Sequence, residues 1–320
     1  MSKSILVTGG AGFIGSHLVD RLLQAGHRVT VLDNFNDFYD PAIKRQNSEA
    51  HREFADYRLV EGDIRDRQTV VDCFKSGSFD ELVHLAAMAG VRPSIANPVL
   101  YQEVNLIGTM NLLEACREFK IGKFVFASSS SVYGNNEKVP FSETDPVDNP
   151  ISPYASTKKS GELMAYTYHH LYSIPTACLR FFTVYGPRQR PEMAIHLFTD
   201  RIFRGEPIQM FGEGDTRRDY PFIEAIVDGI LSCLELPFDY EIFNIGRSDT
   251  VKLADLISKV EILLEKRAKI IVKPTQPVDV NQTFADIKKA GSMLGYKPKV
   301  SIDQGLAHFV NWYLKQRRMG

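Results

Sequence analysis

The first half of the chain alternates short, continuous apolar runs with longer segments of helical periodicity. The clearest helical segments follow Gly15 and cover 105–119, and the apolar runs occupy residues 4–8, 28–33, 59–61, 81–87, 123–128 and 176–180. Strands that are apolar on both faces and separated by helices are typical of a parallel sheet. The pattern therefore predicts an α/β fold with a Rossmann-type, doubly wound parallel sheet, in which ligands bind at the carboxyl ends of the strands.

This alternation becomes irregular after residue 180, where turn-forming sequences such as Gly186-Pro-Arg and Gly205-Glu-Pro appear. We therefore predict a nucleotide-binding Rossmann domain over 1–180 and a smaller C-terminal α/β substrate-binding lobe over 181–320. One alternative stays open at the boundary. A segment at 222–246, which combines a helical pattern with an apolar run, could return to the first sheet.

Composition narrows the class of protein. The 320 residues are 44% hydrophobic and carry a formal net charge of −1, so the chain can bury a large core and has no global field that attracts nucleic acid or a membrane. Its four cysteines lack the paired spacing of metal ligands. We see no apolar span of about 20 residues and no signal-peptide pattern. We expect a cytoplasmic protein that binds no metal, nucleic acid or membrane.

A glycine-rich turn connects the first apolar run to the first helical segment. Gly9, Gly12 and Gly15 are spaced by three, which lets the backbone turn tightly and approach a pyrophosphate at the helix N-terminus. The next strand ends in Asp33, where a carboxylate can hydrogen-bond the adenosine ribose hydroxyls and repel a 2′-phosphate. This order and spacing predict a dinucleotide site that prefers NAD to NADP.

A second signal is the pair Tyr154 and Lys158. Their separation of four residues places the phenol and the ammonium on one face of a helix. A tyrosine ionises near pH ~10, so it becomes a useful base at neutral pH only when a neighbouring cation stabilises the phenolate. The serine run 128–131 precedes this pair and falls at a predicted strand end. Together these features favour proton-transfer chemistry.

Six motifs identify a family. The chain resembles the extended short-chain dehydrogenase/reductase family, and within it the nucleotide-sugar epimerases, over essentially its whole length. The matching motifs lie at residues 8–15, 84–87, 128–134, 154–158, 180–186 and 218–220. Two further segments, 33–40 and 186–194, look most like those of UDP-glucuronate 4-epimerases.

The resemblance implies a reversible oxidation at C4 of a UDP-sugar. In this mechanism Tyr154, as a phenolate, takes the proton of the 4-hydroxyl, while NAD accepts the hydride and later returns it to the other face of a rotated 4-keto sugar. Ser129 bridges the hydroxyl and the phenol, and Lys158 lowers the pKa of Tyr154 and holds the nicotinamide ribose. The residues expected to contact NAD are Gly9, Gly12, Phe13, Ile14, Gly15, Asp33, Asn34, Asp63, Ile64, Ala86 and Lys158.

The same resemblance indicates how the sugar is recognised. Thr183 stands where many relatives that act on neutral sugars have asparagine, and it is assigned to a sugar carboxylate with Arg190 as partner, because a guanidinium forks two hydrogen bonds onto a carboxylate. Arg218 is assigned to the UDP diphosphate, whereas Arg188 is either a ligand or a solvated loop charge. The full set of residues expected to bind substrate is Arg92, Ser129, Ser130, Tyr154, Thr183, Arg190 and Arg218.

Several alternatives stay open. A UDP-sugar 4,6-dehydratase has an Asp-Glu pair where this chain has Ser130-Ser131. A UDP-glucuronate decarboxylase shares the 4-keto intermediate, and a UDP-glucose 4-epimerase is the runner-up. A non-catalytic NAD-binding protein would lack the Tyr154–Lys158 pair. By family analogy we expect a homodimer, in which helices 105–119 and 154–172 of two subunits meet; the apolar stripe through Leu163 and Leu171 is either core or this interface.

Overall fold

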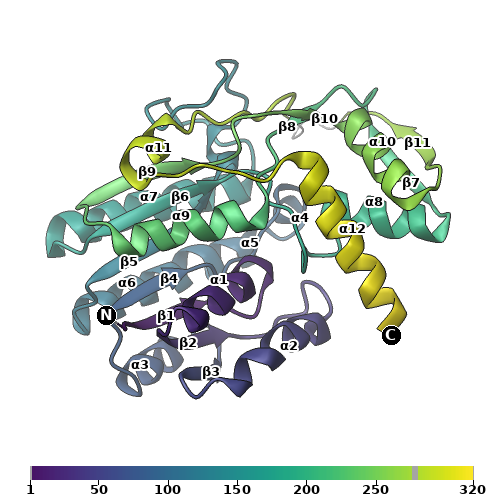
Figure 1. Ribbon diagram of the computed structural model, residues 1–320. Helices are drawn as coiled ribbons and strands as arrows, with labels where there is room; N and C mark the ends of the chain where they lie inside the picture. The colour runs from purple at the N-terminus through teal and green to yellow at the C-terminus, as the bar shows by residue number, and fades with distance from the viewer. Residues whose placement is uncertain (1, 276–279, 320) are drawn as a thin grey trace.

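The computed structural model describes residues 2–275 and 280–319 and is organised around one large parallel sheet (Figure 1). The seven strands lie in the order β3-β2-β1-β4-β5-β6-β9, and each is parallel to its neighbours. Their bounds are β1 Ser4–Thr8, β2 Arg28–Asp33, β3 Tyr57–Glu61, β4 Glu81–His84, β5 Lys123–Ser129, β6 Thr176–Phe181 and β9 Tyr240–Ile245. The strand order reverses direction at β1, which confirms the predicted Rossmann-type, doubly wound fold.

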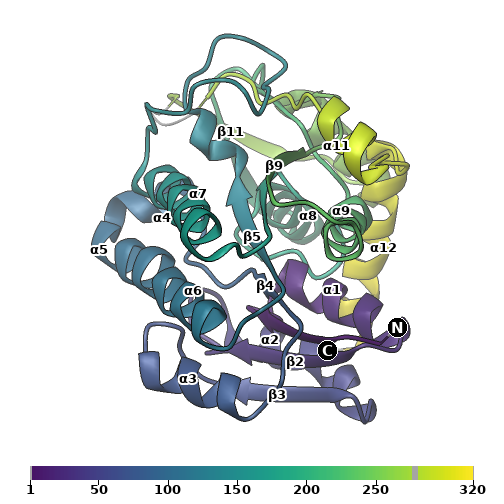
Figure 2. The same ribbon diagram turned by 90° about the vertical axis from the view of Figure 1, so that its left-hand side faces the viewer.

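Helices cover both faces of this sheet (Figure 2). On one face lie α1 Phe13–Gln24 and α9 Ile223–Glu235, and on the other α3 Arg67–Lys75, α6 Gly108–Glu118 and α7 Pro153–Tyr172. Successive side chains of a strand point to opposite faces. In β1, for example, Val7 joins the core beneath α1 and α9, whereas Leu6 joins the core beneath α3, α6 and α7. This double burial explains the continuous apolar runs of the sequence.

The last strand of the sheet comes from the second half of the chain. β9 pairs with β6, with Ile242 opposite Cys178, and α9 packs against α1. The chain therefore leaves the sheet after β6 and comes back to it at residues 223–245, the segment for which the sequence left a return open.

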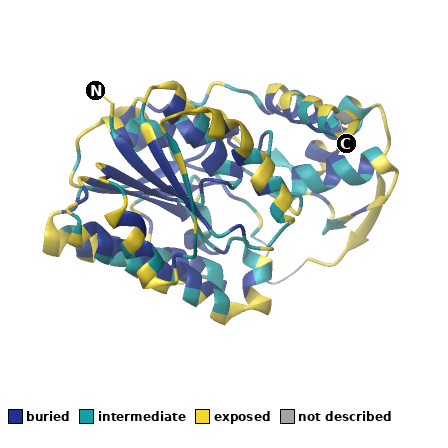
Figure 3. Cartoon of the chain, turned by 90° about the horizontal axis from the view of Figure 1, so that it is seen from below, coloured by how far each residue is buried: buried dark blue, intermediate teal, exposed yellow. Residues whose placement is uncertain are grey.

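Most of the other C-terminal elements build a smaller unit over the carboxyl ends of the strands (Figure 1), whereas α11 Lys288–Leu294 packs against β9 and α9. The smaller unit contains a parallel pair, β7 with β11, and an antiparallel pair, β8 with β10. Figure 3 shows the main sheet as buried, whereas β11 is exposed along its length. The elements of this unit are α8 Ala194–Arg204, β7 Pro207–Phe211, β8 Arg217–Arg218, β10 Val251–Lys252, α10 Leu253–Leu264, β11 Lys269–Lys273 and α12 Ile302–Met319.

Short helices complete the connections. They are α2 Pro41–Glu49, η1 Ala50–Glu53, α4 Val91–Ala96, α5 Pro98–Gln102, η2 Glu103–Ile107 and η3 Ser130–Tyr133. The helix expected at 105–119 is formed by the π-helical turn η2 followed by α6. Within the described ranges, no helix is both long and apolar enough to cross a membrane.

A buried polar network ties α7 to the strands beneath it. The Arg180 guanidinium donates to both carboxylate oxygens of Glu162, at 2.8 and 2.9 Å, and to the hydroxyl of Tyr133 at 2.9 Å. Ser128 donates to the same carboxylate at 2.6 Å. Both charged side chains of this pair are about 1% exposed, and each has its hydrogen-bonding groups matched, as burial of charge requires. The network holds the helix of Tyr154 against the serine run.

Candidate active site

The turn between β1 and α1 has the shape that a bound diphosphate requires. Gly9 has a φ of 71°, and a Cβ on Gly15 would lie 2.2 Å from the carbonyl oxygen of Gly9, so only glycine fits at both positions. Among the described residues no side chain caps Gly12 at the start of α1, which leaves the first amides of the helix available to an anion. This cradle fits the diphosphate of a dinucleotide.

Asp33 joins the glycine turn to the end of β2. Its carboxylate accepts the backbone N–H of Ala11 at 3.1 Å and that of Phe35 at 2.9 Å. Burial raises the pKa of Asp33, and these amides oppose the rise. Next to it, Asn34 donates to Asp63 at 3.0 Å, so the ends of β2 and β3 are fixed side by side. This arrangement leaves one buried carboxylate facing the space above the turn.

All the residues predicted to bind cofactor or substrate line a single cavity of about 580 Å³. It runs from the glycine turn, across the carboxyl ends of the strands, to the small C-terminal unit. The predicted residues that it brings together are Gly9, Gly12, Phe13, Ile14, Gly15, Asp33, Asn34, Asp63, Ile64, Ala86, Arg92, Ser129, Ser130, Tyr154, Lys158, Thr183, Arg190 and Arg218. None of them lies outside it.

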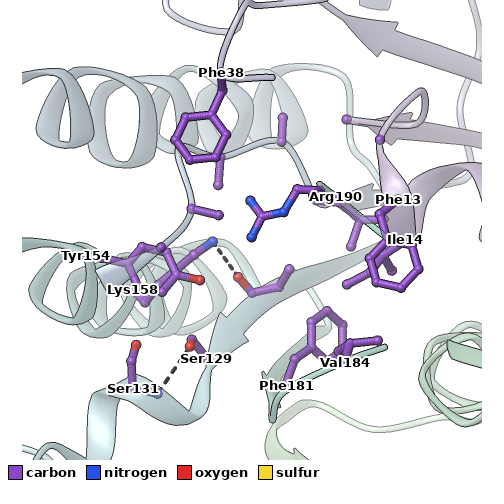
Figure 4. Close-up of a pocket in the computed structure, with 18 of the residues that line it drawn as sticks. Phe13, Ile14, Phe38, Ser129, Ser131, Tyr154, Lys158, Phe181, Val184 and Arg190 are labelled. Atoms are coloured by element: carbon purple, nitrogen blue, oxygen red, sulfur yellow. Dashed lines mark hydrogen bonds between the residues drawn. The ribbon is translucent and has the colours of Figure 1, made fainter. Parts of the chain in front are cut away.

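Tyr154 and Lys158 lie in the first turns of α7, which begins at Pro153 after the capping residue Ser152. The Lys158 ammonium donates to the carbonyl of Ala127 at 2.7 Å and lies 5.9 Å from the centre of the Tyr154 ring. Burial lowers the pKa of Lys158 to about 7. The two side chains therefore share one face, as their spacing predicts, and lie next to each other in the cavity (Figure 4).

The pKa of Tyr154 has three determinants in the cavity. Burial raises it, whereas the interaction with the Ser129 hydroxyl and the positive charge of Arg190 lower it, and the net effect is a rise. Ser129 also accepts the backbone N–H of Ser131 at 3.2 Å, which holds its oxygen toward the phenol (Figure 4). Arg190 thus influences the pKa of Tyr154 although the two residues are far apart in the sequence.

The Arg190 guanidinium projects into the cavity (Figure 4). It lies 5.6 Å from the centre of the Phe38 ring, and its Nε is 3.1 Å from a carboxylate oxygen of Glu192. Its side chain is only 20% exposed, yet it makes no hydrogen bond to any described residue. A partly buried guanidinium that has only this one ion pair, through its Nε, keeps its four terminal N–H groups for an anionic ligand.

The loop that carries Arg190 is attached to α1. His17 contacts the carbonyl oxygen of Pro187 through its Nε2 at 2.9 Å, and Arg188 donates to Asp20 at 2.7 Å. Arg188 does not line the cavity, and its ion pair with Asp20 fits neither of the two predicted alternatives, a ligand or a solvated loop charge. The consequence is that the nucleotide-binding helix sets the position of Arg190.

Thr183 and Arg218 are brought together through Asp219. The Asp219 carboxylate is fully buried and accepts backbone N–H groups that include those of Arg247 at 2.7 Å and Ala285 at 3.1 Å. Its backbone oxygen accepts the N–H of Thr183 at 3.1 Å. Asp219 therefore connects the end of β6 to the loops of the small unit that surround the cavity. At the rim, the Arg92 guanidinium lies 4.2 Å from the ring centre of Phe211.

The cavity is also lined by residues that were not among the predicted ligands, and four of them bear on the chemistry of the site. Phe38 and Lys44 come from the segment after β2, Ser131 from the serine run and Glu192 from the Arg190 loop. The Ser131 hydroxyl is buried and has no hydrogen-bond partner among the described residues, and Lys44 is 5% exposed, with its ammonium bonded to Asn36. Phe38 lies in segment 33–40 and Glu192 in segment 186–194, which served only to select a subfamily, whereas Lys44 and Ser131 lie outside both segments.

The described part of the chain contains no cluster of three or more histidine, cysteine, aspartate or glutamate side chains that could hold a metal ion. The donor set instead fits a dinucleotide: a glycine cradle for the diphosphate, a carboxylate for a ribose, and a lysine and tyrosine at the far end. Two ligands, a dinucleotide and an anionic molecule near Arg190, are compatible with the cavity.

Comparison with known proteins agrees with this geometry. The family model described as GDP-mannose 4,6 dehydratase matches residues 6–309. The UDP-glucuronate 4-epimerase of Thermodesulfobacterium geofontis is 41% identical, over 96% of this chain and 95% of that protein. The relationship therefore spans the whole fold.

Two solved structures are similar over nearly the full length. The UDP-glucuronic acid 4-epimerase of Bacillus cereus, in complex with UDP-glucuronic acid and NAD, has a TM-score of 0.92 and 35% identity, covering 98% of this chain and 99% of that one. The UDP-glucose 4-epimerase of Thermotoga maritima, with UDP-glucose, has a TM-score of 0.91 and 34% identity over the same shares. The resemblance inferred from the motifs is confirmed. The chain belongs to the extended short-chain dehydrogenase/reductase family, as an NAD-dependent nucleotide-sugar 4-epimerase.

Proposed function

We propose that this enzyme interconverts UDP-glucuronate and UDP-galacturonate. The observation that carries the proposal is the Arg190 guanidinium, which lies in the cavity of Tyr154 and is ion-paired there only through its Nε, with Glu192. A uronate carboxylate would accept two of its N–H groups in a fork, which a neutral hydroxymethyl group cannot match. The relative in Thermodesulfobacterium and the Bacillus structure, both called UDP-glucuronate 4-epimerases, support this choice.

The residues around the phenol have distinct roles in the proposal. Tyr154 removes the proton of the sugar 4-hydroxyl and returns a proton after the sugar has turned over. Ser129 shares a hydrogen bond between the hydroxyl and the phenol, and Lys158 holds the nicotinamide ribose and supplies positive charge. NAD, when bound, supplies the hydride acceptor and donor. Because the hydride is returned in each cycle, the cofactor should stay bound.

The carboxylate requires a firm hold, because a 4-keto uronate is a β-keto acid and readily loses carbon dioxide. Thr183 and Arg190 would hold the carboxylate in the plane of the sugar, and the Ser131 hydroxyl, which has no hydrogen-bond partner among the described residues, is a further donor in the same cavity. In that plane the breaking C–C bond cannot overlap with the carbonyl. Release of carbon dioxide at a rate equal to epimer formation would instead indicate a decarboxylase.

A UDP-glucose 4-epimerase is the second candidate, since the Thermotoga enzyme is almost as similar in structure. Initial rates with UDP-glucuronate and UDP-glucose, measured over the same concentration range, separate the two. The proposal requires a kcat/KM that is at least about 10²-fold higher for the uronate, the size of one forked charge-assisted interaction. A higher kcat/KM for UDP-glucose than for UDP-glucuronate would instead support a UDP-glucose 4-epimerase.

We infer a homodimer from an apolar helix face, defined as Ile107, Met110, Leu163 and Leu171 on η2, α6 and α7. Leu163 is 55% and Leu171 is 60% exposed, so the part of the stripe that they form is not core, while Tyr168 of the same helix is buried. α6 and α7 lie side by side (Figure 2). Large exposed apolar areas mark interfaces, and a second copy would form the expected four-helix contact.

Replacing Leu163 with lysine should convert the dimer to a monomer, because a charge would be buried at the centre of the contact. Sedimentation velocity measures the change. The matched control is Ile262→Lys on α10, which is 74% exposed and lies outside this face. A wild-type protein that sediments as a monomer, or equal dissociation of both variants, would contradict the interface.

A cytoplasmic location also belongs to this proposal. All four cysteines are free and buried, which is typical of proteins in a reducing compartment. UDP-sugars are the expected partners.

A further inference from the structure

Arg190 is held between an aromatic ring and an acid. The Phe38 ring lies on one side of the guanidinium, at 5.6 Å, and the Glu192 carboxylate approaches the Nε at 3.1 Å. The same loop contributes both charged residues, with one residue between them, and both line the cavity. Glu192 is therefore the anion that balances Arg190 within the described structure.

The two members of this pair differ in how easily they can move. The Arg190 side chain is 20% exposed and that of Glu192 is 39% exposed. Arg190 is confined by Phe38 and by a loop that the Arg188–Asp20 ion pair attaches to α1. Glu192 has no ion pair or hydrogen bond to another described residue. It can turn into solvent and regain hydration, whereas Arg190 has no comparable route.

A substrate carboxylate that binds Arg190 therefore meets a guanidinium that is already ion-paired with Glu192. Two carboxylates on one partly buried guanidinium would leave a net negative charge in a site of low polarity, which is unfavourable. We propose that Glu192 is the resident counter-ion of Arg190 and competes with the substrate carboxylate for it, so that Glu192 determines the selectivity between uronic and neutral UDP-sugars. This inference rests on the proposed function, because it requires the carboxylate at Arg190.

The proposal has opposite consequences for the two substrate classes. A uronate must displace Glu192, so the Glu192→Gln variant should have a KM for UDP-glucuronate about fivefold lower than the wild type, the size of one partly exposed ion pair. A neutral sugar leaves the pair in place, so the KM for UDP-glucose should change less than about twofold.

The experiment is a double-mutant cycle with Glu192→Gln, Arg190→Ala and the combined variant, in which KM and kcat are measured for both substrates. The proposal expects Glu192→Gln to lower the KM for UDP-glucuronate only when Arg190 is present. The matched control is Glu206→Gln, an exposed acid just after α8, which tests the effect of net charge alone.

The outcomes separate this inference from the proposed function. If Arg190→Ala leaves the KM for UDP-glucuronate unchanged, the carboxylate does not bind Arg190 and the proposed function itself fails. If Arg190→Ala raises that KM but Glu192→Gln leaves it unchanged or raises it too, Glu192 does not compete, and this inference alone is overturned. An equal gain in the Arg190→Ala background, or with Glu206→Gln, would overturn it as well.

Discussion

Replacing Tyr154 with phenylalanine is expected to lower the kcat of UDP-sugar epimerisation by about 10³-fold or more, the upper part of the range for general acid–base groups. The phenol hydroxyl is the group that exchanges the proton, and phenylalanine keeps the ring and its packing. NAD should remain bound in full, because the cradle of Gly9, Gly12 and Gly15 is untouched. Turnover is measured by product chromatography, and bound NAD by its release from the denatured protein.

The control for this variant lies on the same helix. Tyr166 is 50% exposed and three turns from Tyr154, so Tyr166→Phe removes a hydroxyl without affecting the reacting sugar. Its kcat should stay within about twofold of the wild-type value, as is usual for surface substitutions. Substantial activity in Tyr154→Phe, or an equal loss in Tyr166→Phe, would contradict the role of Tyr154.

Replacing Arg190 with alanine is expected to raise the KM for UDP-glucuronate by on the order of 10²-fold, because hydrogen bonds to charged groups contribute roughly 1.5–3 kcal/mol. The KM for UDP-glucose and the Kd of UDP should change far less. Steady-state kinetics and calorimetric titration of UDP measure these effects. Arg204→Ala, at the exposed end of α8, is the matched control for loss of a surface arginine.

The same variant should also alter the pH dependence. The charge of Arg190 lowers the pKa of Tyr154, so its removal raises that pKa, and the phenolate then forms only at higher pH. The rising limb of the kcat profile should therefore move to higher pH for both substrates. Arg190→Lys keeps the charge but cannot form two parallel hydrogen bonds to a carboxylate. It should therefore raise the KM for UDP-glucuronate and leave the rising limb of the pH profile in place.

If Arg190→Ala weakens the binding of UDP-glucuronate and of UDP equally, the role of Arg190 in binding the carboxylate is contradicted.

The fold was readable from the sequence because its strands are buried on both faces. Val7 and Leu6 are adjacent in β1 but enter two different cores, so residues 5–7 are all apolar and lack the alternation of a half-exposed strand. The glycine turn was equally readable, since a Cβ at Gly15 would contact the backbone of Gly9. Such local constraints restrict which residue types can occupy a position, so they can be recognised in the sequence.

Other features of the fold and the site depend on contacts between residues that are far apart in the chain, and these could not be recognised from local sequence patterns. The return of β9 to the sheet is decided by its pairing with β6, which helical or strand periodicity cannot reveal. Phe38 and Glu192 lie in loops and Lys44 lies in α2, and only the folded chain brings the three to the cavity that holds Arg190. The pairing of Arg188 with Asp20 joins residues far apart in the chain, so the sequence alone left that arginine between two readings.

The most direct test of the central claim is to incubate the purified protein, with no added cofactor, separately with UDP-glucuronate and with UDP-glucose, and to resolve the products by chromatography. The account predicts UDP-galacturonate from the first incubation, formed with NAD that the protein has retained. UDP-galactose from the second incubation, with no UDP-galacturonate from the first, would contradict the assignment of a carboxylate to Arg190.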